Sequence, residues 1–159
     1  MTEEQAQARA VPPELVEMLA GRPQLAEKFQ HFQNAFHEEG ALDPRLLELC
    51  RARSDALHGV EQVIDEGAGS EAVLDVESGR QIAGGQFDAF AEHEQQALSL
   101  AEQLAIDAHG VSDQQVAALT TALGEAAAVS LLTAVSMHDA RIRLQKVLEP
   151  FNKRSVESQ

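Results

Sequence analysis

One stretch of the chain decides the fold class: residues 42–59 read LDPRLLELCRARSDALHG. Asp43 followed by Pro44 is a strong helix start, because an acidic N-cap accepts hydrogen bonds from the first turn and proline is tolerated at the first helical position. Apolar side chains then recur at spacings of three and four: Leu46, Leu49, Cys50, Leu57, Val60, Val63 and Ile64. This period predicts an amphipathic helix that is ended by Gly67 and Gly69.

Helix signals also precede this stretch. Pro12 and Pro13 open a predicted short helix that ends near Gly21, and Pro23 begins a second helix that Gly40 closes. The second helix carries a stripe made of Leu25, Phe29, Phe32 and Phe36. Spacings of three and four place these side chains on one face, so we expect the stripe to face the core.

Further helices follow it. Ser70 is expected to cap a short helix through Glu77, and residues 79–86 read as a loop. The remaining expected elements are a helix from Phe87 to His109-Gly110, a helix opened by the capping-box pair Ser112 and Gln115 and ending near Leu123, and a long helix from Glu125 to Pro150. No run alternates with the period of two that strands require. The predicted class is all-α, a bundle of about six or seven helices.

The 159 residues fit one domain, which we place at residues 11–151, between a disordered tail at 1–10 and a polar tail at 152–159. Six Phe and no Trp or Tyr leave Ala, Leu and Val to fill the interior. Such helices pack closely but build thin cores, so we expect a homo-oligomer that buries more surface by self-association.

Charge excludes several classes of partner. Twelve basic and 26 acidic side chains give a formal net charge of −14, which repels nucleic acids and anionic membrane surfaces. No segment approaches the roughly 20 apolar residues of a membrane span, and the N-terminus lacks the pattern of a secretory signal. A single cysteine, Cys50, cannot form an intrachain disulfide. We therefore expect a cytoplasmic protein.

Two stretches, by their order and spacing, resemble the carboxymuconolactone decarboxylase and alkylhydroperoxidase D-like superfamily. The first is the stretch at 42–59, and the second reads EQQALSLAE at 94–102, followed by GVSD at 110–113 and the helix around 140–144. The resemblance extends from Leu42 to Leu148. It implies an all-helical, alkylhydroperoxidase D-like bundle that assembles as a trimer or hexamer.

The resemblance also maps a catalytic motif onto this chain. Peroxidase members carry a Glu, a Cys twelve positions later, a second Cys three positions after that, and a His four positions further on. Glu48 matches the Glu, whereas Val60, Val63 and Gly67 occupy the other three positions. Because valine cannot form a thiolate, two-cysteine peroxidase chemistry is expected to be absent. The decarboxylase branch tends to keep the motif His, so Gly67 places that reaction in doubt as well.

Glu48 is the first candidate for chemistry that survives. Its neighbours on the helix are apolar, and burial would raise its pKa and make it a general acid or base near neutral pH. Alternatively, Glu48 pairs with Arg51 or Arg45 and only stabilises the fold. Val60 and Val63 would line a dry pocket beside it, suited to an apolar or carbonyl-bearing small molecule.

Two histidines are candidate partners of Glu48. His58 lies one turn after Ser54, but a Ser–His nucleophile needs an orienting acid, and Asp55 is poorly placed for that role. His138 and Asp139 interrupt the final apolar helix, and Arg141 and Arg143 follow. This cluster could line a pocket, bind a carboxylate or exchange protons, or it could be an exposed face or a subunit contact.

No cofactor or metal is expected, because no His-x3-His or Glu-x2-His ligand pair is present. Three functions remain open. The first is a cofactor-free acid–base enzyme that uses Glu48 with His58 or His138 for decarboxylation, isomerisation or lactone chemistry. The second is a non-catalytic oligomeric protein that binds a ligand or partner. The third is a one-cysteine peroxidase that uses Cys50, which requires an accessible thiol.

Overall fold

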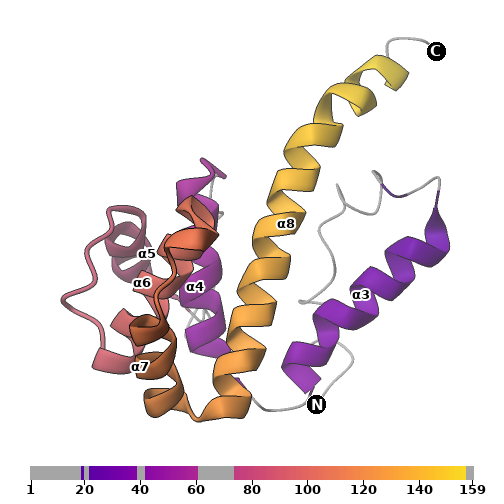
Figure 1. Ribbon diagram of the computed structural model, residues 1–159. Coiled ribbons are helices and arrows are strands. Elements are labelled where there is room, and N and C mark those ends of the chain that lie inside the picture. Colours follow the sequence, from indigo (N-terminus) through magenta and orange to yellow (C-terminus); the bar gives the residue numbers. More distant parts are fainter. Residues whose placement is uncertain (1–18, 20–21, 39–41, 61–73, 157–159) are drawn as a thin grey trace. The chain divides into compact units, whose positions relative to one another are not determined.

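A computed structural model describes residues 19, 22–38, 42–60 and 74–156 of the chain. These residues contain no strand and form six α-helices and one 3-10 helix (Figure 1). The elements are α3 (Pro23–Glu38), α4 (Pro44–Leu57), α5 (Val76–Ala83), α6 (Glu92–Ile106), η1 (Ala108–Gly110), α7 (Asp113–Leu123) and α8 (Glu125–Val156). The predicted all-α class is confirmed for this part of the chain.

The tail at 1–10, the helix predicted to begin at Pro12 and the cap predicted at Ser70 lie outside the described residues. Within the described ranges, no helix combines the length and the apolar character that crossing a membrane requires.

The chain divides into two compact units. Unit 1 consists of residues 1–40 and 141–159, and unit 2 consists of residues 41–140. The long helix α8 therefore contributes its first sixteen residues to unit 2 and its remainder to unit 1. Each unit is described by itself.

Helix α4 begins where the sequence predicts. Asp43 is its N-cap, and the Asp43 side chain accepts a hydrogen bond of 2.9 Å from the backbone N–H of Arg45. The helix ends at Leu57, and the predicted continuation is wrong at residues 58–60. The cause is Gly59, whose positive φ of 64° lets the chain turn left-handed after the helix.

Two backbone hydrogen bonds complete this end of α4. The N–H of Gly59 donates to the carbonyl of Ala56, and the N–H of Val60 donates to the carbonyl of Asp55. These two bonds are those of a Schellman motif, which satisfies carbonyls that the end of a helix would otherwise leave open. A glycine directly after His58 was the sequence signal for this stop.

Helix α5 replaces part of a predicted loop. Residues 79–83 are helical, so the loop expected at 79–86 is wrong there. Asp75 caps the helix through the N–H and hydroxyl of Ser78, and the bond from that backbone N–H is the main reason that the pKa of Asp75 lies below its usual value. Burial of Ile82 holds the other end of α5 in place.

Helix α6 begins at Glu92 and not at Phe87. The carboxylate of Glu94 accepts a bond from the backbone N–H of Ala91 and a second one from Arg45 on α4, which fixes the first turn of the helix. The capping box predicted for α7 is confirmed, because the Ser112 hydroxyl and the Gln115 amide oxygen each accept from the other's backbone N–H.

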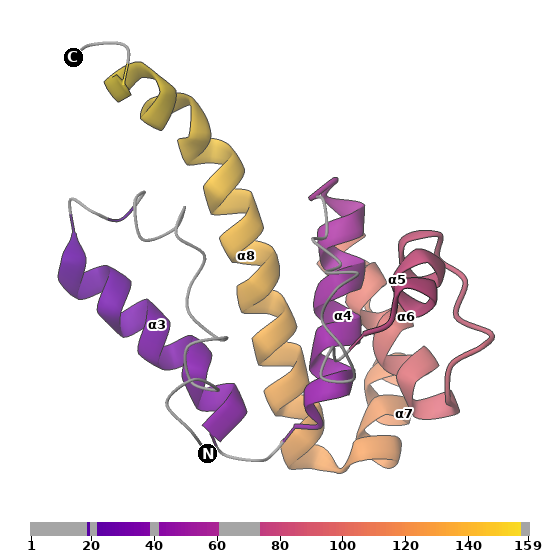
Figure 2. The same cartoon turned by 180° about the vertical axis from the view of Figure 1, so that it is seen from behind.

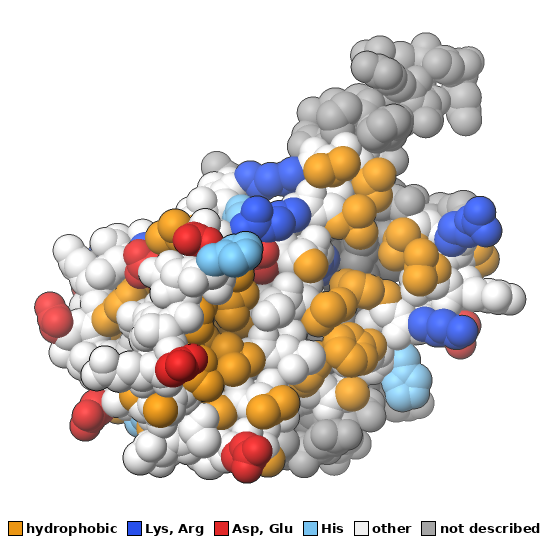
Figure 3. Space-filling model, in the orientation of Figure 1, with side chains coloured by type: hydrophobic (Ala, Val, Ile, Leu, Met, Phe, Trp, Pro, Cys, Tyr) orange, Lys and Arg blue, Asp and Glu red, His pale blue; other side chains and the backbone are white. Residues whose placement is uncertain are grey.

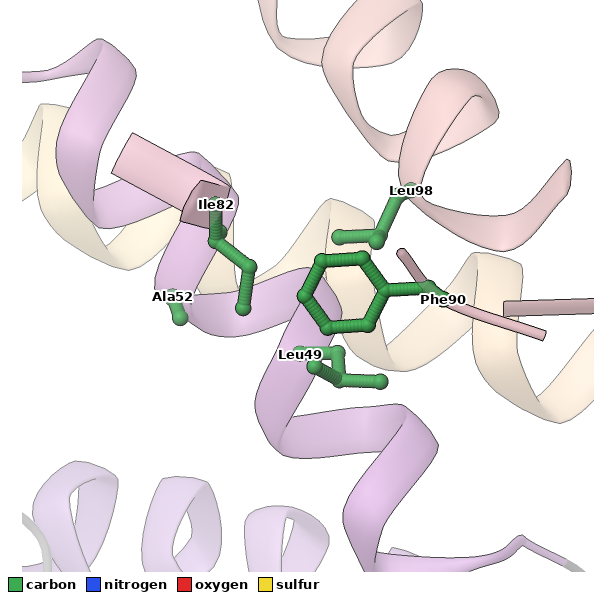
Figure 4. Close-up of a cluster of buried hydrophobic side chains, with 5 residues drawn as sticks. All are labelled: Leu49, Ala52, Ile82, Phe90 and Leu98. Carbon is green, nitrogen blue, oxygen red and sulfur yellow. The ribbon is translucent and has the colours of Figure 1, made fainter. Parts of the chain in front are cut away.

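The core of unit 2 lies among α4, α5 and α6. Leu49 and Ala52 of α4 pack with Ile82 of α5, Phe90 of the preceding loop and Leu98 of α6, and Figure 4 shows the Phe90 ring between the two leucines. All five side chains are buried. Because aromatic residues are few, aliphatic side chains supply most of this apolar contact, as the composition predicts.

A buried arginine joins the same three helices. Arg53 of α4 donates from Nη1 to the carbonyls of Ile82 and Ala83, and its Nη2 lies 3.0 Å from a carboxylate oxygen of Glu102 on α6. Its guanidinium carbon also lies 5.6 Å from the centre of the Phe87 ring. Arg53 thus binds the carbonyl end of α5 and neutralises an acid of α6.

Helix α8 is 32 residues long and continues past the predicted end at Pro150. Proline removes one backbone hydrogen bond, but this loss does not end the helix here. In both views of the molecule, the first half of α8 runs beside α4 (Figures 1 and 2). Ala128, Leu131, Ala134 and Val135 are buried along this half.

Helix α3 begins at Pro23 as predicted, but its apolar stripe is not fully covered. The side chains of Leu25 and Phe32 are 54% and 42% exposed, so the prediction that the whole stripe faces the core is wrong. The Phe32 and Phe36 rings contact each other edge to face at 5.1 Å.

Candidate functional site

Helix α4 has an apolar face and a polar face. Leu49 and Ala52 face the core with α5 and α6. A polar stripe at spacings of three and four follows another side of the helix, and it consists of Glu48, Arg51, Ser54, Asp55 and His58. Because residues three and four apart lie on one face of a helix, these side chains follow one line. Asp55 and His58 are the members that reach α8.

Two histidine–carboxylate pairs cross between α4 and α8. Nε2 of His58 on α4 lies 2.5 Å from Oδ1 of Asp139 on α8. Nε2 of His138 on α8 lies 2.8 Å from Oδ1 of Asp55 on α4. Each helix therefore gives one acid and one imidazole, and each imidazole binds the acid of the other helix. We call these four residues the crossed pairs.

The crossed pairs are largely buried. The side chain of His138 is 8% exposed and that of Asp139 is 12% exposed, while His58 and Asp55 retain 16% and 20%. Four ionisable groups removed from water to this extent are costly unless each has a partner, and here each one has a partner. An imidazole held by a carboxylate can exchange a proton, and it can also fix one helix against another.

Glu48 is engaged on its own helix. Its carboxylate accepts a hydrogen bond of 2.9 Å from Nη1 of Arg51, and its side chain is 37% exposed. Of the two arginines that the sequence offers as partners of Glu48, Arg51 is therefore the one that pairs with it. Arg45, the other predicted partner, binds Glu94.

Of the two predicted pocket residues, the structure describes Val60. Val60 follows the end of α4, and its side chain is 37% exposed. Val63 and Gly67 lie outside the described residues. Val60 does not extend the polar stripe, because the left-handed turn at Gly59 redirects the chain before it.

The two arginines after Asp139 belong to unit 1. Nη1 of Arg141 donates to the side-chain oxygen of Gln145, one turn along α8, at 2.8 Å. Arg143 is exposed on the same helix. Within the predicted cluster, His138 and Asp139 are buried, Arg141 is partly exposed and Arg143 is exposed.

Ser54 is fully buried, and its hydroxyl has no hydrogen-bond partner within the part of the chain that the structure describes. His58, which lies one turn away, is oriented by Asp139 from α8. Asp139, 81 positions away in the sequence, therefore supplies the orienting acid for which His58 has no suitable neighbour on its own helix. A hydroxyl without solvent access does not meet a substrate, so the geometry does not favour Ser54 as a nucleophile.

Cys50 is expected to be inert in the native protein. The side chain is fully buried, and this burial raises the pKa of the thiol from 9.0 to about 12. At pH 8 the thiol is therefore protonated and inaccessible, so a chromogenic disulfide reagent should react only after urea denatures the protein. Rapid stoichiometric reaction in the native state would contradict this and restore the one-cysteine peroxidase hypothesis.

Sequence reasoning identified three of the four residues of the crossed pairs as members of clusters, but it missed how they pair. Asp55, which is poorly placed along the helix to orient His58, binds His138 instead. A signal was present: Asp55 and His58 lie three apart on one helix, and His138 and Asp139 form a second acid–imidazole set. Their meeting depends on how α8 packs on α4.

Among the described residues, no group of three or more His, Cys, Asp or Glu side chains is arranged to hold a metal ion. No family model, curated protein or solved structure matches this chain.

Proposed function

We propose that the chain is a member of the carboxymuconolactone decarboxylase and alkylhydroperoxidase D-like superfamily that lacks the cysteine pair and the motif histidine. We propose further that it acts as a non-catalytic, self-associating protein that binds a partner or ligand. The family part of the proposal rests on the order and spacing of the stretches at 42–59 and 94–113. Valine at positions 60 and 63 removes the thiol chemistry of the peroxidase branch.

One observation carries the non-catalytic part. Glu48, the only residue of the motif that this chain retains, is committed to Arg51 in a partly exposed pair on the same helix. The Glu48 side chain is 37% exposed and the Arg51 side chain 15% exposed, so the pair is partly buried on the same helix. A carboxylate that is engaged by a guanidinium in this way serves the fold as an ion pair.

The test compares wild type with Glu48→Gln. We expect neither protein to turn over hydroperoxides, lactones or β-keto acids. The substitution should lower the melting temperature by less than about 3 °C, because glutamine keeps a hydrogen-bond acceptor for Arg51 and a partly exposed pair contributes about 1 kcal/mol. Glu77→Gln is the matched control, since Glu77 also pairs with an arginine three residues later. Turnover that Glu48→Gln abolishes would overturn the non-catalytic proposal.

A second candidate is a cofactor-free acid–base enzyme that uses His58 in place of Glu48. It is favoured by the contact of 2.5 Å between His58 and Asp139, because a carboxylate behind an imidazole orients the ring. Of the two histidines in the crossed pairs, His58 is the more exposed. Turnover in the same panel that survives Glu48→Gln and disappears in His58→Gln would establish this candidate.

A further inference from the structure

The exposed side of α3 is apolar and has basic edges. Leu25 and Phe32 lie seven residues apart, two turns along one face, and both are exposed. Lys28 lies between them on the same side, and Arg22 directly precedes the helix. Both cations are exposed. We call these four residues the α3 face.

The part of α8 in unit 1 has the same character. Leu144 and Val147 lie one turn apart and are 39% and 64% exposed. Arg143 and Lys146, also exposed and also one turn apart, accompany them. Figure 3 shows apolar side chains on the surface along α3 and along α8, and also over the other helices.

The formal charge of the chain is divided unequally between the two units. Residues 41–140 contain 17 acidic and 4 basic side chains, a net charge of −13. Residues 1–40 and 141–159 contain 9 acidic and 8 basic side chains, a net charge of −1. Nearly all of the excess negative charge is therefore carried by unit 2.

Unit 2 cannot neutralise this excess with its own cations. Its four arginines, at positions 45, 51, 53 and 80, are already bound to Glu94, Glu48, Glu102 and Glu77 of the same unit. Cations from elsewhere would reduce the repulsion among its remaining acids. The exposed cations of the α3 face have the sign and the position to do so in another molecule.

We propose that the α3 face docks on the acidic unit 2 of a second copy of this chain. This inference rests on the self-association in the proposed function and assigns its surface. Docking removes Leu25 and Phe32 from water, while Arg22 and Lys28 approach carboxylates of the partner. Unit 2 of the partner supplies these carboxylates, with a net charge of −13. An anionic membrane would meet the same cations, and vesicle binding is therefore one outcome of the test.

The test is sedimentation velocity of the full chain over a range of concentrations and at two salt concentrations, about 0.05 M and about 0.5 M. We expect wild type to associate, and to associate more weakly at the higher salt. The double variant Leu25→Gln/Phe32→Gln should raise the dissociation constant at least about tenfold, because exposed apolar anchors contribute disproportionately to such contacts. Lys28→Glu should also raise the dissociation constant at the lower salt concentration, and this increase should disappear at the higher one, because salt screens the charge.

Glu27→Gln is the control, because two residues of helix turn the side chain about 200° away from Leu25. It should leave association unchanged, and helical content by circular dichroism should be equal in all variants. If the double variant associates as strongly as wild type, the α3 face is not the contact surface, although self-association itself still holds. If wild type is a monomer at every concentration, both the α3 face and the proposed self-association are wrong. A monomer that binds vesicles of anionic lipid through Phe32 would assign the face to membranes instead.

Discussion

Replacing His138 by leucine should lower the free energy of unfolding by about 3 kcal/mol, because it leaves the Asp55 carboxylate between two helices without its partner. The pair is 2.8 Å long, and its side chains are 8% and 20% exposed, so solvent screens it only in part. Urea denaturation followed by circular dichroism measures the change. His138→Gln keeps a donor at this position and should recover part of the loss.

A double-mutant cycle separates the pair from the packing around it. Asp55→Asn alone should lower the free energy of unfolding. The double variant with His138→Leu should lower it by about 1–2 kcal/mol less than the sum of the two single effects, and this difference is the coupling energy. Arg80→Met, which breaks an exposed pair with Glu77, is the control and should cost less than about 1 kcal/mol. Additive effects of the two substitutions would contradict a direct interaction between Asp55 and His138.

Arg53→Met should also lower the free energy of unfolding by about 3 kcal/mol, since it removes the donors to two carbonyls and to Glu102 from a buried position. Methionine keeps much of the length and the contact with Phe87, so the loss measures the polar contacts. Arg53→Lys should be intermediate, because an ammonium group cannot span the same partners.

Gly85 lies against the same arginine. It has a positive φ of 70°, and a Cβ atom there would lie 3.3 Å from Nη2 of Arg53, so the site leaves little room for a side chain at this position.

Arg45→Met is the control for Arg53→Met, because the Arg45 side chain is 41% exposed in its pair with Glu94 and should contribute much less to stability. Equal losses in the free energy of unfolding for Arg53→Met and Arg45→Met would show that the burial of Arg53 adds nothing to stability.

Local signals determined most of the helix boundaries. The Asp43-Pro44 start, the Ser112–Gln115 capping box and the Pro23 start depend only on neighbouring residues, and all three are observed. The errors at 58–60 and 79–83 are also local in origin. Gly59 ends α4 through a Schellman motif although the apolar period continues beyond it. Asp75 caps α5, which continues through Gly79 although glycines are typical of loops.

The polar contacts across helices could not be predicted in the same way. His58 meets Asp139 across 81 positions, and His138 meets Asp55 across 83. Arg53 finds its acceptors 29 and 30 residues away. Periodicity places a side chain on one face of its own helix, but it does not say which other face it meets.

The sequence by itself determined the all-helical class of the described residues, the acidic charge, the presence of a single cysteine and most helix starts, because these follow from composition and from neighbours along the chain. Only the tertiary structure decided the partners of Glu48, His58 and His138, and the exposure of Leu25 and Phe32. The physical reason is that pairing and burial depend on which helices pack together. That choice is made by the free energy of the whole fold and not by any one segment.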